Sequence, residues 1–221
     1  MEKLLAYLKQ PVNKNWLIGY DSDEFSQLSE QFFSELHQQM NGETPLKVLL
    51  VESEPLRFLA AFVAAVAADC SVFLGNPNWV EQEWKDVFDL VQPDVILGNI
   101  YTFPQLDKTK KLEEFRIDNR QRILIPTGGS SGKIRFAIHT WETLMTSVYG
   151  FQNYFQLNFI NSFCVLPLYH VSGLMQFMRS FTTGGQLMIG SFKSFQLGEY
   201  IKLNPEEFFI SLVPTQLQRC L

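Results

Sequence analysis

The stretch Ile123-Leu124-Ile125-Pro126-Thr127-Gly128-Gly129-Ser130-Ser131-Gly132-Lys133-Ile134-Arg135 runs from an apolar strand into a loop made almost wholly of glycines and hydroxyl residues. The glycines allow positive φ angles and close backbone approach, so successive N–H groups can turn inward around an anion. The hydroxyl and basic residues of this loop region are Thr127, Ser130, Ser131, Lys133 and Arg135. The composition therefore predicts a loop that holds phosphate.

The residues on either side of the glycines predict one strand before the loop and another after it. Residues 122–125 form the incoming apolar strand, and residues 134–139 alternate with the period of two that a strand requires. This pattern disfavours a Walker nucleotide-binding loop. Such a loop needs glycine in place of Thr127, a hydroxyl in place of Ile134 and a helix directly afterwards.

Two further interpretations share the same glycines. Residues 128–132 fit the hydrolase nucleophile elbow G-x-S-x-G around Ser130, with Glu142 and His170 following in acid-then-histidine order. An elbow also needs a helix directly after the serine, and the alternation of residues 134–138 argues against one. The other interpretation is a flexible hairpin tip with no ligand, as short Gly/Ser segments often form.

The stretch resembles the phosphate-binding signature T-S-G-T-T-G-x-P-K-G of the adenylate-forming superfamily, the acyl-CoA synthetases and their relatives. The matching positions are Thr127 for the leading threonine, Gly129 and Gly132 for the glycines, Ser130 and Ser131 for the hydroxyl pair, and Arg135 for the lysine. The departures are Gly128 for serine, Ile134 for proline and Phe136 for the second glycine. The basic charge and the phosphate-wrapping glycines are retained.

A second motif strengthens this resemblance. Leu166-Pro167-Leu168-Tyr169-His170-Val171-Ser172-Gly173 is similar to the superfamily's downstream motif, P-L-[FY]-H-x-x-G. We expect a short apolar strand over residues 163–168, a following helix capped by Ser172, and His170 at the corner between them. Active-site residues of open α/β sheets collect at such corners. The alternative is a structural histidine that bonds loop backbone.

Within the superfamily, the closest resemblance is to the o-succinylbenzoate–CoA ligases of menaquinone and phylloquinone biosynthesis. Their motif reads P-L-[FY]-H-V-S-G and is followed by a helix with an arginine and a small-residue turn. Arg179 occupies that place, ahead of Thr182-Thr183-Gly184-Gly185. A lone arginine on an apolar helix is costly to bury unless an anion meets it, and guanidinium can take a carboxylate through two hydrogen bonds. Otherwise Arg179 would be a solvent-facing helix residue.

The resemblance implies an ATP-dependent, AMP-forming acid–thiol ligase. The implied residues are Thr127, Gly128, Gly129, Ser130, Ser131 and Gly132 for the ATP phosphates, Arg135 and His170 for catalysis, and His170, Ser172, Gly173 and Arg179 for the acid. ATP, Mg²⁺ and CoA are the implied cofactors and co-substrate. The magnesium ligands, the adenine contacts and the catalytic lysine are expected beyond Leu221, so this fragment is expected to be inactive alone.

Three alternative functions remain at this stage. The first is another carboxylate–CoA ligase of the superfamily. The second is a serine hydrolase that uses Ser130 as its nucleophile. The third is a non-catalytic nucleotide-binding module that has the fold without the activity.

Composition and cysteine usage favour a soluble cytoplasmic enzyme, and the resemblance implies small-molecule partners, namely a carboxylic acid, ATP and CoA. The 221 residues are 46% hydrophobic with a net charge of −5, which gives no general basic surface for nucleic acid. Cys70, Cys164 and Cys220 are widely spaced and odd in number, which predicts reduced core thiols without a disulfide or metal framework. The apolar run 58–68 is too short to span a bilayer, and no signal-peptide pattern is seen. Homo-oligomer formation is left open.

The order of elements predicts an α/β fold with mostly parallel sheets flanked by helices. Strands at 47–51, 71–74 and 94–97, with helices between them, form a βαβαβ unit. We expect residues 1–120 to form a first α/β subdomain and its connection, and residues 121–221 a phosphate-loop and acyl-pocket subdomain. The chain ends without a helix stop signal, so it is expected to be the truncated front part of the superfamily's large N-terminal domain.

Overall fold

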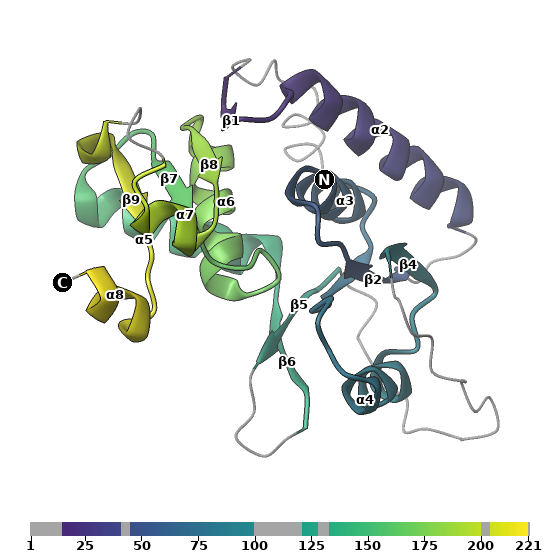
Figure 1. Cartoon of the computed structure of the whole chain (residues 1–221). Helices are drawn as coiled ribbons and strands as arrows, with labels where there is room; N and C mark the ends of the chain where they lie inside the picture. Colours follow the sequence, from purple (N-terminus) through teal and green to yellow (C-terminus); the bar gives the residue numbers. More distant parts are fainter. Residues whose placement is uncertain (1–14, 41–44, 100–120, 128–132, 200–203, 221) are drawn as a thin grey trace. The chain divides into compact units, whose positions relative to one another are not determined.

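The computed structural model describes residues 15–40, 45–99, 121–127, 133–199 and 204–220 (Figure 1). The chain divides into two compact units, one made of residues 25–141 and the other containing residues 15–24 and 142–220. Each unit has its own β-sheet. The predicted α/β fold with mostly parallel sheets is confirmed.

The first unit contains a five-stranded sheet in the order β4-β2-β3-β5-β6. Its strands are β2 (Lys47–Val51), β3 (Ser71–Leu74), β4 (Val95–Gly98), β5 (Ile123–Thr127) and β6 (Arg135–His139). Neighbouring strands are parallel apart from β5 and β6, which are antiparallel. Its helices are α3 (Pro55–Ala67), α4 (Glu81–Val91) and most of α2 (Ser22–Gln39). The predicted βαβαβ unit is confirmed.

Helices cover opposite faces of this sheet because strand side chains alternate between faces. Leu49, Val51, Phe73 and Leu124 form one buried cluster with the apolar side of α4. α3 packs against β2 and β3 on the other face (Figure 1). Nearly all of α3 is buried, and the Arg57 guanidinium of α3 lies 5.4 Å from the ring centroid of Phe32 in α2.

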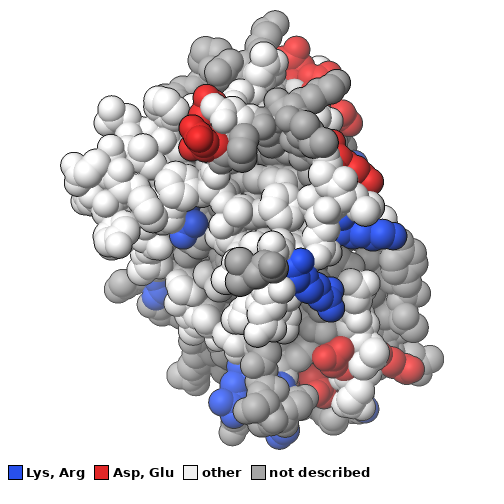
Figure 2. All heavy atoms as spheres, turned by 60° about the vertical axis from the view of Figure 1, so that its left-hand side comes forward, with Lys and Arg blue, Asp and Glu red and all other residues white. Residues whose placement is uncertain are grey.

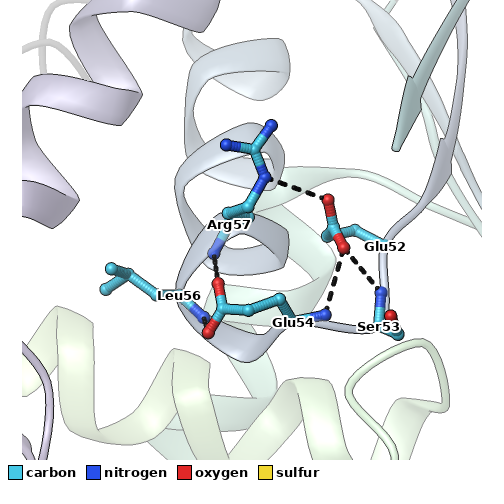
Figure 3. A network of polar contacts seen from close by, with 5 residues as sticks. All are labelled: Glu52, Ser53, Glu54, Leu56 and Arg57. Atoms are coloured by element: carbon cyan, nitrogen blue, oxygen red, sulfur yellow. Dashed lines mark hydrogen bonds and ion pairs between the residues drawn. The ribbon is translucent and has the colours of Figure 1, made fainter. Parts of the chain in front are cut away.

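An acidic turn joins β2 to α3 (Figure 3). The Glu54 carboxylate caps α3 by accepting hydrogen bonds from the N–H groups of Leu56 and Arg57, at 3.1 and 2.7 Å. The buried Glu52 carboxylate accepts from the N–H groups of Ser53 and Glu54 and from Nε of Arg57, at 2.9, 3.1 and 3.2 Å. Both carboxylates therefore find their partners within the turn, which fixes the start of α3.

The second unit contains a four-stranded parallel sheet in the order β1-β8-β7-β9. Its strands are β1 (Leu17–Ile18), β7 (Asn161–Cys164), β8 (Leu187–Ile189) and β9 (Phe208–Ile210). Its helices are α5 (Trp141–Phe155), α6 (Val171–Thr183), α7 (Phe192–Gln196) and α8 (Pro214–Cys220), with a short 3₁₀ turn over Pro205–Glu207. α6 packs against β7 and β8, and its Phe177 and Phe181 contact Trp16.

Two predicted boundaries around the second motif are wrong. β7 ends at Cys164, not near residue 168, because residues 165–170 turn toward α6 and the His170 N–H donates to the Pro167 carbonyl at 3.1 Å. Ser172 does not cap α6, because the capping position is held by His170 and Ser172 is already within the helix.

Local hydrogen bonds set the start of α4. The helix begins at Glu81, because the Asn76 side chain closes a turn with the Asn78 N–H at 2.9 Å and the Glu83 carboxylate then accepts from the Val80 N–H at 2.9 Å. One further prediction differs from the structure. Cys220 is exposed on α8 and is not a core thiol, whereas the other two cysteines are buried. Among the described helices, none combines the length and apolarity needed to cross a bilayer.

Candidate functional site

The strands on both sides of the glycine loop form an antiparallel pair. Thr127, the last residue of β5, is the register partner of Arg135, the first residue of β6. The Thr127 hydroxyl donates to the Arg135 carbonyl at 3.2 Å. The predicted strand before the loop and the predicted strand after it are confirmed. The chain continues into β6 and not into a helix, which is contrary to a nucleophile elbow at Ser130.

The loop residues themselves lie outside the described residues. These are Gly128, Gly129, Ser130, Ser131 and Gly132. Their role in phosphate binding therefore remains a prediction from the sequence. The described residues at the loop's two ends are Thr127 and Lys133, and both are exposed.

Thr127 lies at the carboxyl edge of the parallel strands, where ligands of open α/β sheets bind. β5 pairs with β3 only through Ile123 and Leu124, so Pro126 follows the last paired residue and its missing N–H breaks no bond to β3. Arg135 is exposed at the start of β6, and among the described residues no carboxylate lies within 4.0 Å of its guanidinium. Its charge is available to an anion.

Phe136, which stands where the superfamily signature has glycine, belongs to an aromatic cluster. Its ring packs edge-on against Phe73 and Trp79, with centroids 5.5 and 6.5 Å apart. Trp79 in turn packs edge-on against Trp84 at 5.0 Å. The cluster anchors β6 just after the loop, so this departure from the signature has a structural reason. The sequence motif alone does not indicate this cluster, because the contacting residues come from three separate segments.

His170 lies at the corner between β7 and α6, as predicted, and holds the capping position of the helix. Its backbone is extended at φ −99° and ψ 150°, and its carbonyl accepts from the Leu174 N–H at 2.9 Å. The half-buried imidazole lies 4.7 Å from the Tyr169 ring and makes no capping bond to the helix. Burial lowers the pKa of His170 below its ordinary value, so the ring is neutral at neutral pH.

The two other predicted acid-binding residues of the motif differ in exposure. Ser172 is exposed in the first turn of α6, whereas Gly173 is buried. A Cβ atom on Gly173 would lie 2.1 Å from the Pro167 carbonyl oxygen, so only glycine lets the helix approach this segment. Gly173 thus has a packing role that explains glycine at this position of the motif.

Arg179 is a half-buried cation on an otherwise largely apolar helix. Its guanidinium lies over the Phe151 ring of α5, 4.1 Å from the centroid, and its Nε is buried without a hydrogen-bond partner among the described residues. No carboxylate of the described residues lies within 4.0 Å. Burial lowers the pKa of the guanidinium, although arginine stays protonated. Arg179 is therefore not a solvent-facing helix residue.

The end of α6 is fixed to the start of β7 by the small-residue turn. The Thr183 hydroxyl donates to the Arg179 carbonyl at 2.7 Å and accepts from the Ile160 N–H at 2.9 Å. Gly184 ends the helix with a left-handed φ of 75°, and a Cβ on Gly185 would lie 2.1 Å from the Ile160 carbonyl oxygen. This turn therefore holds the helix segment that presents Arg179.

The structure brings the predicted residues together as two groups, each within one unit. Thr127 and Arg135 belong to the first unit, and His170, Ser172, Gly173 and Arg179 all lie on or at the start of α6 in the second. On the face shown in Figure 2, lysines and arginines are separated by uncharged and acidic residues and do not form a continuous basic patch. Among the described residues, no group of three His, Cys, Asp or Glu side chains could hold a metal ion.

Comparison with solved structures finds the same fold in adenylate-forming enzymes. The o-succinylbenzoate coenzyme A synthetase from Bacillus subtilis in complex with AMP matches with a TM-score of 0.73 and 17% identity, over 98% of this chain and 62% of that chain. The same enzyme with its acyl-adenylate intermediate gives 0.75 and 18%, over 98% and 63%. The N-terminal domain of FACL13 from Mycobacterium tuberculosis gives 0.72 and 13%, over 98% and 64%.

The chain thus has the fold of the N-terminal domain of adenylate-forming enzymes and spans about three fifths of the length of these solved chains, 62% of the first. No protein-family model matches the sequence, and no curated protein matches it. At 13–18% identity the likeness establishes the fold.

Proposed function

We propose that this chain is part of an ATP-dependent, AMP-forming acid–thiol ligase whose acid is o-succinylbenzoate. The observation that supports the acid most directly is Arg179, a half-buried guanidinium with no carboxylate partner among the described residues. A cation in this position gains most from an anionic ligand, because burial weakens its hydration. o-Succinylbenzoate has two carboxylates, so one can pair with Arg179 while the other reacts.

The proposed reaction has two steps. A carboxylate oxygen of the acid attacks the α-phosphorus of ATP, and the bond to pyrophosphate breaks to give an acyl-adenylate. The sulfur of CoA then attacks the acyl carbon, AMP leaves, and the thiol proton passes to solvent. Such chemistry depends on positioning and charge neutralisation, so the protein need not supply a nucleophile.

The chain's own residues would bind and orient the reactants. Thr127 and the glycine loop would hold the β- and γ-phosphates, and exposed Arg135 would offset their charge. Neutral His170 would form part of the floor between the α-phosphate and the acyl group. Among the described residues no group of three His, Cys, Asp or Glu side chains could hold a metal ion, and we assign none of them to the Mg²⁺ that accompanies ATP.

The test is pyrophosphate release by the complete protein with ATP, CoA and a panel of acids that contains o-succinylbenzoate, benzoate and a medium-chain fatty acid. We expect o-succinylbenzoate to give the highest kcat/KM. A preference for another acid would refute o-succinylbenzoate as the substrate but remain consistent with a ligase. No pyrophosphate release with any acid would refute the proposed ligase activity.

Two further measurements separate the proposal from its rivals. Gly132→Val should abolish adenylate formation while the fold survives, because a β-branched residue blocks positive φ and crowds the phosphate. A serine-directed phosphonate should leave the protein unlabelled, whereas a hydrolase acting through Ser130 would form a covalent adduct.

A further inference from the structure

Three polar side chains are buried where α6 packs against β7. Gln176 and Ser180 of α6 are 1% and 0% exposed, and Ser162 of β7 is 1% exposed. Both amide atoms of Gln176 and both serine hydroxyls have no hydrogen-bond partner among the described residues. Burying such groups unpaired is strongly unfavourable, so native proteins nearly always satisfy them.

The two ends of α6 fix its direction relative to β7. At the start of the helix, the Gly173 carbonyl accepts from the Cys164 thiol at the end of β7, at 3.8 Å. At the end of the helix, Thr183 bonds the Ile160 N–H just before β7. α6 therefore runs antiparallel to β7 along its whole length.

This direction places the three polar residues in one layer. Ser162 shares a face of β7 with Cys164, because strand side chains alternate, and that face meets α6. Gln176 and Ser180 lie three and seven residues after Gly173, about one and two helical turns along the same side of α6. The spacing therefore directs their side chains toward Ser162, in the space between the helix and the strand.

We propose that Ser162, Gln176 and Ser180 enclose an internal hydration site. An ordered water can donate to the Gln176 carbonyl oxygen, accept from its amide nitrogen and bond to the two hydroxyls. These four bonds lie within the range of roughly two to four that a buried water makes. A neutral donor and acceptor fits this set better than an ion does, because none of the three side chains carries a charge. The water would fix the distance of α6 from the sheet, and so the positions of His170 and Arg179 at the helix start and in its third turn.

The test replaces each polar group and follows thermal unfolding of the protein. Gln176→Met keeps the length of the side chain but removes its hydrogen bonds, and Ser162→Ala and Ser180→Ala remove the hydroxyls. If water is bound, each variant should lower the unfolding midpoint by about 2–4 °C, the shift expected when one net hydrogen bond is lost in a protein of this size. Gln218→Met, on exposed α8, is the matched control and should leave the midpoint unchanged.

A rise in the unfolding midpoint of Gln176→Met would overturn the proposal. In a dry layer, Gln176→Met would remove an unpaired amide and raise the midpoint. A high-resolution crystal structure gives the second measurement, and we expect water within hydrogen-bonding distance of Gln176 and at least one of the two serines. If density shows the Gln176 amide bonded only to protein atoms, or if Gln176→Met weakens acid binding without changing the midpoint, the layer is not a hydration site. Neither outcome bears on whether the protein is a ligase.

Discussion

The guanidinium carbon of Arg179 lies 4.1 Å from the centroid of the Phe151 ring, so a cation on α6 rests on an aromatic face of α5. Stacking uses the flat face of the guanidinium and leaves the N–H groups at its edge free to bond a carboxylate. Phe151 itself packs against Phe155 and Phe209, at 4.6 and 5.0 Å between centroids, so the ring is held in place. The stack therefore orients Arg179 before any ligand arrives.

Removing Arg179 should weaken the binding of the acid and leave the binding of ATP unchanged. We expect Arg179→Ala to cost about 1.5–3 kcal/mol of acid binding, the range for a hydrogen bond to a charged group, which is about tenfold to a hundredfold in affinity. Arg179→Lys should restore little, because a point charge cannot form the bidentate contact. Titrations of o-succinylbenzoate and of ATP against each variant of the complete protein give the two affinities.

Arg57→Lys is the control for this prediction, because Arg57 also stacks on an aromatic ring, that of Phe32. It should change neither affinity. Equal losses for acid and ATP in Arg179→Ala would point to a folding role for Arg179, and no loss for either would remove it from the acid site.

Adding one methyl group to Gly173 should disrupt the start of α6. The new Cβ would lie 2.1 Å from the Pro167 carbonyl oxygen, so the backbone must move, at a cost of about 1–3 kcal/mol or more in the free energy of unfolding. Gly150→Ala on α5 is the matched control. A Cβ there meets nothing within 4 Å, so this variant should gain about 0.5–1 kcal/mol from helix propensity. Urea unfolding measures the stability of both variants, and equal free energies of unfolding would contradict the packing role of Gly173.

Local patterns in the sequence predicted what local physics determines. The apolar run before the glycine loop and the period of two after it predicted the strands β5 and β6, and the Pro167–Gly173 motif predicted a helix soon after His170. The cap was wrong because Ser172 is a favourable capping residue by type, yet the turn that His170 closes with Pro167 begins the helix two residues earlier. The geometry of the turn between β7 and α6, and not the capping preference of serine, therefore determines where this helix begins.

Contacts between distant segments were not predicted. β1 is only two residues long and has no detectable period, and it becomes a strand because Leu17 pairs with Leu187. The partner of Arg179 was expected to be an anion, and residue spacing offers no reason to choose Phe151 among 20 phenylalanines as its stacking partner. Such pairs depend on how α5 and α6 pack, which residue spacing does not specify.

The three cysteines should differ sharply in reactivity. Burial raises the pKa of Cys70 to about 12 and that of Cys164 to about 11, whereas Cys220 is exposed. Because the thiolate is the reactive form, an aromatic disulfide reagent at pH 8 should label one thiol quickly and the other two only on unfolding. Cys220→Ser should abolish the fast phase. Fast labelling of two or three thiols in the native protein would contradict the burial of Cys70 and Cys164.

His170 should make the protein less stable in mild acid. Burial lowers the pKa of the folded imidazole, while the unfolded chain keeps the ordinary value of about 6.5. Between these two values the unfolded state binds a proton that the folded state does not, so acidification favours unfolding. Well above pH 6.5 His170 does not lower the free energy of unfolding. The loss in this free energy grows as the pH falls through 6.5 toward the pKa of the folded protein.

The measurement compares urea midpoints of the wild type and of His170→Gln at pH 7.5, 6.5 and 5.5. Titration of other groups affects both proteins alike, so a steeper decline of the wild type below pH 6.5 isolates the contribution of His170. Identical pH dependence, or an imidazole that titrates at or above pH 6.5 by NMR, would contradict the burial of the ring.

A neutral His170 at neutral pH also bears on the proposed reaction. In the proposed reaction the neutral ring would add no charge that changes between pH 8 and pH 7, so adenylate formation should keep its rate over this range.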